Sequence, residues 1–133
     1  MARILAVAPV LPEHATTQAQ ITAELAAGMT DDPAARAVMQ RIHAASGIET
    51  RHLALPLAEY RAIEGFTATN ALFAELALPL AERAVTAALA EAGMRVDEVD
   101  HLFFTTVTGL GAPSLDAQLA TSMGFRSDLR RVP

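Results

Sequence analysis

Cysteine and lysine are both missing from this sequence, and each of these absences excludes a group of functions. None of the 133 residues is a cysteine, so the chain holds no disulfide, no thiolate nucleophile and no cysteine-ligated metal. None is a lysine either, and all ten positive charges are arginine. Schiff-base catalysis and the phosphate-binding loop of nucleotide hydrolases both need a lysine, so these residues supply neither.

Basic patches and long apolar runs are also missing. The formal net charge of −5 gives no electrostatic reason to bind nucleic acid or an anionic membrane. The apolar run after Arg3 is interrupted by Pro9, too early for a secretory signal, and no run approaches the ~20 residues of a membrane span. We therefore expect a soluble cytoplasmic protein that binds neither nucleic acid nor membrane.

What is present is the composition of a globular domain. Apolar residues make up 52% of the chain and charged residues 19%, which excludes a disordered polypeptide. A chain of this length can bury roughly two thirds of its unfolded surface. The sequence shows no internal repeat and no linker, so we treat residues 1–133 as belonging to one domain.

The order of the elements predicts an α/β fold with a mostly parallel sheet flanked by helices. Ile4–Ala8 is a continuous apolar run, typical of a strand buried on both faces, and Pro9–His14 predicts a loop. His101–Thr108 is rich in β-branched and aromatic residues and follows a helix and a turn, as in a parallel sheet. Arg130–Pro133 is typical of the entrance to another strand. Gly109–Pro113 then forms the loop at the carboxyl end of a strand, where open α/β sheets bind ligands.

Capping residues and apolar spacing predict four helices. Their ranges and start signals are Gln18–Ala27 after Thr16 or Thr17, Ala34–Ala45 after Asp31–Pro33, Thr67–Ala92, and Ser114–Met123. A glycine suited to ending each helix follows it: Gly28, Gly47, Gly93 and Gly124. Pro79 falls inside the third helix, and we expect it to kink or restart that helix. Ile48–Leu55 predicts a short strand, and Pro56–Gly65 predicts irregular structure.

The polar residues do not assemble into a recognisable catalytic or metal-binding set. The histidines lack ligand spacing, the acidic pairs lie where they cap helices or turns, and the serines lack a nucleophile elbow. Arg126, Arg130 and Arg131 are interpreted as a solvated face rather than an anion site. Thr105–Gly109 is different, because a threonine-rich strand end running into a glycine loop is as compatible with a ligand site as with a structural strand.

One stretch of the sequence resembles a known family. Between Val99 and Leu119 the chain reads V-D-H-L-F-F-T-T-V-T-G, then A-P-S and D-A-Q-L. This is similar to the chalcone synthase family, the type III polyketide synthases, whose corresponding stretch is H-L-x-x-x-T-T-S-G, a variable loop, a proline and D-x-Q-L. Supporting matches follow the order of the family's N-terminal region: Met39–Ile42, Ser46–Ile48, Arg51–Leu53, Gly124–Arg126 and Arg130–Val132.

The resemblance implies a thiolase-like fold built from two similar α/β halves, and a homodimer. It also implies decarboxylative condensation of malonyl-CoA onto an acyl-CoA starter, with these thioesters as substrates and with no further cofactor and no metal. The family's catalytic cysteine follows the strand that begins R-V, and its histidine and asparagine lie further along the chain. We therefore expect residues 1–133 to be the N-terminal part of such an enzyme, with the catalytic residues beyond Pro133.

Substrate-binding residues can be transferred from the family at few positions. Arg41 matches an arginine that contacts the coenzyme A phosphates together with two lysines, which Val38 and Ala45 replace here. A lone arginine can bind one phosphate in a bidentate manner but does not neutralise several. The resemblance thus assigns Arg41 to the coenzyme A site, with a weaker hold on the phosphates.

The other transferred residues belong to the starter cavity. Val107 and Thr108 match a Thr-Ser pair that lines this cavity, and Gly109 ends the same motif. Ala112 matches a methionine that reaches across the dimer into the partner's cavity. Valine and alanine at these places make the cavity less polar and larger, which favours a long-chain aliphatic starter, as in alkylresorcinol or alkylpyrone synthases.

Two other interpretations stay open. A ketoacyl synthase III-like condensing enzyme shares the pattern of Asp97–Phe104, although the spacing of Pro113, Asp116 and Gln118 favours the polyketide branch. The second interpretation is not an enzyme at all but a small non-catalytic α/β module for binding or dimerisation.

Overall fold

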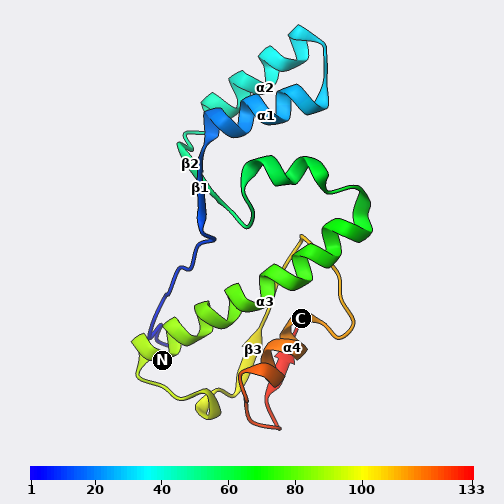
Figure 1. Ribbon diagram of the computed structural model, residues 1–133. Helices are drawn as coiled ribbons and strands as arrows, with labels where there is room; N and C mark the ends of the chain where they lie inside the picture. Colours follow the sequence, from blue (N-terminus) through cyan, green and yellow to red (C-terminus); the bar gives the residue numbers. More distant parts are fainter. The chain divides into compact units, whose positions relative to one another are not determined.

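All 133 residues are described by the computed structural model, and they divide into two units (Figure 1). Unit 1 comprises residues 1–10 and 65–133, and unit 2 comprises residues 11–64. No helix in either unit has the apolar length that crossing a bilayer requires. The principal elements, in chain order, are β1 His14–Thr17, α1 Gln18–Met29, α2 Pro33–Ala45, β2 Thr50–Leu53, α3 Gly65–Ala92, β3 His101–Phe103, α4 Leu115–Ser122 and β4 Arg130–Val132.

In unit 2, α1 begins at a complete capping box. The hydroxyl of Thr17 accepts a hydrogen bond from the Gln20 amide at 3.2 Å, and the Gln20 side chain accepts one from the Thr17 amide at 3.1 Å. This satisfies two backbone donors at the helix start and confirms Thr17 as the N-cap. The helix continues through Gly28 to Met29, because extended backbone at Thr30 ends it instead of a left-handed glycine.

The second helix of unit 2 follows its sequence signals closely. The Asp32 carboxylate accepts a hydrogen bond from the Ala34 amide at 2.9 Å, and Pro33 occupies the first helical position. Gly47 has a φ of 67°, as expected for a residue that follows a helix C-terminus. The pair α1 and α2 pack side by side, and Ile21 and Ala26 of α1 are the buried apolar residues of this unit.

The sheet of unit 2 contains a strand that was not predicted. β1 pairs antiparallel with β2, with His14 opposite Leu53 and Thr17 opposite Thr50. The predicted strand in Ile48–Leu55 is confirmed over Thr50–Leu53, but the loop predicted up to His14 ends where β1 begins. Four polar-rich residues carry little strand signal of their own, and the distant partner β2 supplies their hydrogen bonds.

In unit 1, α3 is one continuous helix. Pro79 lies inside it, so the predicted restart does not occur. Gly93, with a φ of 66°, ends the helix by a Schellman motif in which the amide of Met94 bonds to the carbonyl of Leu89 at 3.0 Å. No residue of α3 is fully buried, although α3 packs against α4, so its apolar stripe is only half covered.

The strands β3 and β4 pair in parallel and are connected through α4, which confirms the strand predicted at Arg130 (Figure 1). His101 lies opposite Arg130, and Phe103 lies opposite Val132. Leu115 and Leu119 of α4 are the buried apolar residues of this unit. The β-α-β order predicted by the sequence is therefore present in unit 1.

Two strand predictions are corrected by the structure. Ile4–Ala8 forms no strand and its larger side chains are exposed, because no strand of the structure pairs with this segment. The strand predicted over His101–Thr108 ends at Phe103, and the last backbone bond to β4 runs from the Phe104 amide to the Val132 carbonyl at 2.9 Å. Thr105–Thr108 therefore lie beyond the end of β3.

Replacing Thr17 by alanine should lower the free energy of unfolding by about 1 kcal/mol, since it removes the N-cap acceptor of α1. Thr17→Ser keeps the hydroxyl and should stay within a few tenths of a kcal/mol of the unchanged protein. Urea unfolding followed by circular dichroism measures both. Equal unfolding midpoints for Thr17→Ala and the unchanged protein would show that the capping box does not contribute.

Candidate functional site

A cavity of about 290 Å³ opens at the carboxyl ends of β3 and β4 in unit 1. The strands contribute the residues that immediately follow them, Phe104 and Pro133, and α3 contributes Phe73. The remaining wall comes from the loop after β3 and from the start of α4: Thr105, Thr106, Gly109, Leu110, Gly111, Ser114, Leu115, Asp116 and Gln118, with Ala74 of α3 beside them. This is the edge of a parallel sheet at which α/β proteins bind ligands.

The loop after β3 lies directly against α3. A Cβ atom on Gly109 would overlap the Phe73 ring and approach Asn70 Oδ1 to 2.9 Å, so only glycine allows this approach. Asn70 also holds the next residue, because its side-chain amide bonds to both backbone groups of Leu110. Asn70 and Phe73 were not predicted as site residues, because both are ordinary positions of a helix in the sequence.

Asp116 is the most deeply buried charged group, with 1% of its surface exposed. Its Oδ2 accepts a hydrogen bond from Arg131 Nη1 at 2.5 Å, which ties the first turn of α4 to β4. Burial by itself opposes ionisation, but the neighbouring Ser114 and the bonded Arg131 outweigh it, so the pKa of Asp116 lies below its ordinary 3.8. Oδ1 has no hydrogen-bond partner. Nothing in the sequence indicated that Asp116 and Arg131 form an ion pair, and the prediction that Arg131 lies on a solvated face did not include this contact.

The predicted substrate-binding residues do not gather in one place. Gly109 lines the cavity, whereas Val107 and Thr108 are exposed and lie outside its lining. Ala112 is exposed and follows the lining residue Gly111. Arg41 lies on the exposed surface of α2 in unit 2. Their assignment to substrate binding stays a prediction.

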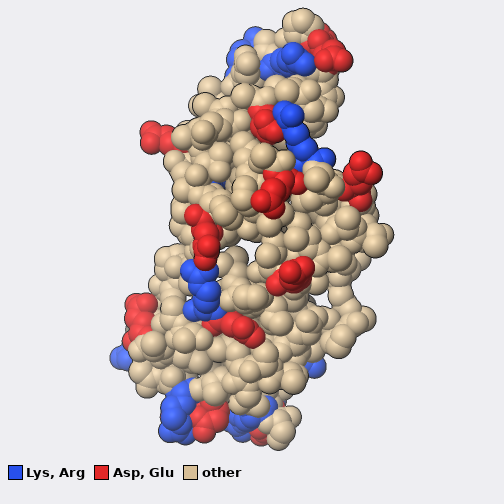
Figure 2. All heavy atoms as spheres, in the orientation of Figure 1, with Lys and Arg blue, Asp and Glu red and all other residues tan.

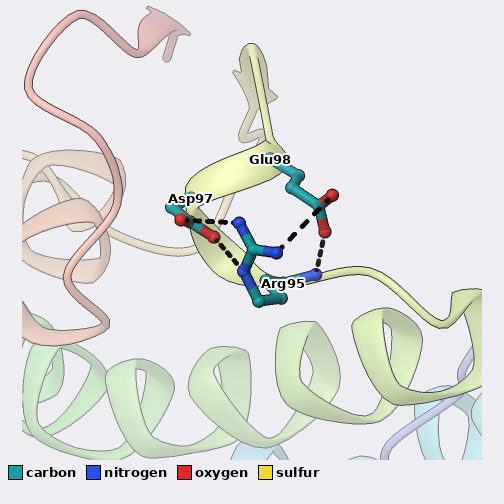
Figure 3. Close-up of polar contacts among 3 residues, drawn as sticks. All are labelled: Arg95, Asp97 and Glu98. Atoms are coloured by element: carbon teal, nitrogen blue, oxygen red, sulfur yellow. Dashed lines mark hydrogen bonds and ion pairs between the residues drawn. The ribbon is translucent and has the colours of Figure 1, made fainter.

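Several exposed charged residues form local clusters that connect neighbouring residues of a turn. Arg95 bonds through Nε to Asp97 at 2.9 Å, and its amide donates to Glu98 at 2.7 Å (Figure 3). The hydrogen bond that Asp97 accepts from Arg95 lowers the pKa of the Asp97 carboxyl. On the face shown in Figure 2, arginine and acidic side chains are interspersed and form no patch of one sign.

Arg126 belongs to a cluster of the same kind. Its guanidinium bonds to Asp128 at 2.6 and 2.7 Å and to Asp100 at 2.5 Å, which connects the residue before β3 to the turn before β4. With both acidic partners in place, Arg126 has a structural role, whereas the sequence predicted a solvated residue.

None of the four histidines lines the cavity of unit 1. His43 Nδ1 lies 2.7 Å from the Thr22 hydroxyl, and His52 Nδ1 lies 2.8 Å from the carbonyl of Pro12. The Thr22 hydroxyl already donates to the carbonyl of Gln18 at 2.6 Å, so His43 Nδ1 is the donor in its bond to Thr22. No three side chains of the metal-ligating types converge in the structure.

Solved structures identify the class of fold to which the parallel β-α-β unit and the rest of the chain belong. Tetrahydroxynaphthalene synthase from Streptomyces coelicolor superposes with a TM-score of 0.83 at 28% identity, over 96% of this chain and 36% of that one. A polyketide synthase from Ectocarpus siliculosus superposes with a TM-score of 0.81 at 26% identity, over 97% and 38% of the two chains. The chain thus has the N-terminal half of the thiolase-like fold of type III polyketide synthases.

The family model for the N-terminal domain of chalcone and stilbene synthases matches residues 1–133, so the chain belongs to this family. A 1,3,6,8-tetrahydroxynaphthalene synthase from Streptomyces peucetius is 44% identical over 98% of this chain and 34% of its own. A phloroglucinol synthase from Pseudomonas fluorescens is 28% identical over 92% of this chain and 35% of its own. The chain therefore spans about one third of the length of these relatives.

Replacing Asp116 by asparagine should lower the free energy of unfolding at pH 7 by about 1 to 2 kcal/mol, because a charge-assisted hydrogen bond becomes a neutral one. The folded-state pKa lies below 3.8, so the stabilisation is fully present above about pH 4 and is lost as the pH falls through the folded-state pKa. The variant should consequently lose less stability than the unchanged protein on acidification from pH 5 to pH 2.

The exposed carboxylate of Asp128 provides the matched control, since its pKa is also lowered by an arginine but water screens the pair. Urea unfolding at a series of pH values measures Asp116→Asn and Asp128→Asn together. Parallel pH profiles for Asp116→Asn and the unchanged protein would contradict the assigned role of the buried pair.

Proposed function

We propose that the intact protein containing this chain is a type III polyketide synthase, an acyltransferase that condenses malonyl units onto an acyl starter. The observation that carries the proposal is the family match over all 133 residues, together with a cavity at the carboxyl ends of a parallel strand pair. The relatives support it by their names, which describe synthases of tetrahydroxynaphthalene and phloroglucinol.

The proposed reaction has defined bond changes. The bond between malonyl carbon and carboxylate breaks and releases carbon dioxide, and the resulting carbanion attacks the carbonyl carbon of the acyl thioester. A carbon–carbon bond forms and the thiol leaves. This chain contains no cysteine, so the thiol that carries the acyl group must come from residues outside it.

Coenzyme A thioesters are the proposed substrates, without a further cofactor. One structural neighbour, CsyB, was solved as a complex with coenzyme A, although at 24% identity it supports the fold alone. Arg41, exposed on α2, is our candidate for binding a phosphate of the coenzyme, since its guanidinium is free to form a bidentate contact. We place the enzyme in the cytoplasm, where coenzyme A thioesters are made.

A long-chain aliphatic starter is the proposed substrate class. Val107 and Ala112 stand where the family has a polar residue and a methionine, and both changes favour an apolar acyl chain. At ~0.8 kcal/mol per buried methylene, four additional methylenes would change selectivity by roughly two orders of magnitude. A relative named acylalkylpyrone synthase, from Aspergillus oryzae, is 34% identical over 53% of this chain, whereas the relative at 44% identity is named for tetrahydroxynaphthalene, a product without an alkyl tail.

The homodimer is likewise a proposal. Val107 is fully exposed and Leu110 is 76% exposed, both on the loop that follows β3. Two large apolar side chains on one short exposed loop are typical of a surface that another protein covers. A second copy of the chain is the partner that the family resemblance implies.

A starter profile of the intact protein tests the proposed function. With malonyl-CoA as extender, we expect palmitoyl-CoA to give products faster than hexanoyl-, benzoyl- or acetyl-CoA, measured by mass spectrometry of the products and by release of coenzyme A. If condensation prefers a short or aromatic starter, the proposed polyketide synthase activity stands and the proposed long-chain starter is rejected. No condensation with any starter would reject both.

Ala112→Met restores the methionine of the family at the position proposed to face the starter cavity. We expect the accepted starter to become shorter, with a loss of about tenfold or more in kcat/KM for palmitoyl-CoA and little change for acetyl-CoA, because a methionine side chain displaces several methylenes of the acyl chain. Ala90→Met places the same side chain at an exposed position of α3 outside the cavity lining, and it provides the control. An unchanged starter profile for Ala112→Met would remove Ala112 from the substrate cavity.

A further inference from the structure

The side chain of Asn70 makes an unusual bridge from α3 to the loop after β3. Its Oδ1 accepts a hydrogen bond from the Leu110 amide at 2.7 Å, and its Nδ2 donates one to the Leu110 carbonyl at 2.9 Å. Both backbone groups of one residue are therefore paired by one side chain from 40 positions earlier in the sequence. The side-chain amide offers Leu110 the donor and acceptor that a neighbouring strand would offer.

This bridge stands where the ladder of the sheet has ended. The last backbone bond between the strands is made by Phe104, and after it the chain has only a local bond from the Thr108 amide to the Thr106 hydroxyl. Asn70 is thus the first connection from this loop to a regular element. Gly109, pressed against Phe73 one turn further along α3, allows the loop to come close enough for it.

Local preference does not explain an asparagine at this position. Asn70 lies inside α3, where asparagine is a poor helix former and where no cap requires it. Both of its bonds to Leu110 are exposed to water, so each contributes little to overall stability. What the pair supplies is geometry, because two bonds to one residue fix both the distance and the orientation of the loop.

We propose that Asn70 is a positioning residue, which holds the loop between Thr105 and Ala112 on α3 and thereby determines the acyl starter that the cavity accepts. This inference rests on the proposed function, since the loop carries the four predicted starter-cavity residues, namely Val107, Thr108, Gly109 and Ala112. Asn70 acts through the loop and has no chemical role of its own. When the Asn70 bonds are removed, the loop samples a wider range of positions and the enzyme discriminates less between starters.

The experiment compares three variants of the intact protein. Asn70→Ala removes both bonds and favours the helix, so the melting temperature should hold or rise while the loop is released. Asn70→Asp keeps the acceptor for the Leu110 amide but places a second acceptor against the Leu110 carbonyl. Thr69→Ala is the matched control, because the Thr69 hydroxyl bonds only to the Gly65 carbonyl of its own helix.

The first measurement is hydrogen exchange in peptides spanning residues 105–112. We expect exchange in this loop to become about five- to tenfold faster in Asn70→Ala and to stay unchanged in Thr69→Ala. This arm needs no activity, so it tests the bridge even if the proposed function fails. Equal exchange in Asn70→Ala and the unchanged protein would overturn the inference.

The second measurement is the starter profile with malonyl-CoA as extender. In Asn70→Ala we expect KM for the preferred starter to rise about five- to tenfold, while kcat stays within about twofold of that of the unchanged protein. The ratio of kcat/KM between the preferred starter and the other starters should fall by a similar factor. Asn70→Asp should resemble Asn70→Ala, because one retained bond does not orient the loop. A uniform loss of kcat for all starters, or a fall in melting temperature that accounts for the loss, would show a merely structural role and overturn the inference.

Discussion

The parallel pairing of β3 with β4 is the interaction on which the candidate site depends. Because the two strands run in the same direction, the residues after both of them emerge at one edge, where the N-terminus of α4 also lies. An antiparallel pair would place these two ends at opposite edges of the sheet. The strands are short, and the Arg126 cluster at their start and the Asp116–Arg131 pair beside β4 support their register.

Polar contacts, more than apolar packing, position this site. Leu115 and Leu119 are the buried apolar side chains of unit 1, and the long helix α3 has none. An exposed hydrogen bond contributes about 1 kcal/mol or less, which is small beside a buried leucine, but it has direction where packing has little. The bonds of Asn70 and Asp116 therefore define where the loop and the strand lie, while the leucines supply the stability that keeps α4 in place.

Most of the regular structure could be predicted from local signals. Thr17, Asp32, Gly93 and Gly124 act at helix ends in the way that their types and positions indicate, and the β-α-β order in unit 1 is confirmed. Two of the errors concern helix breaks, since α1 continues through Gly28 and α3 through Pro79, and the others concern strands. β1 was missed and the Ile4–Ala8 strand did not form, because a strand depends on a partner that its own residues do not specify.

The sequence by itself determined the family, the helices with their caps, and the absence of a thiol among these residues, because each of these depends on residue type and local spacing. Only the tertiary structure decided that Asn70 binds the backbone of Leu110, that Asp116 and Arg131 form a buried pair, and that Val107 lies outside the cavity. These contacts join positions far apart in the chain, and their geometry is set by how α3, α4 and the two strands pack, which no local pattern encodes.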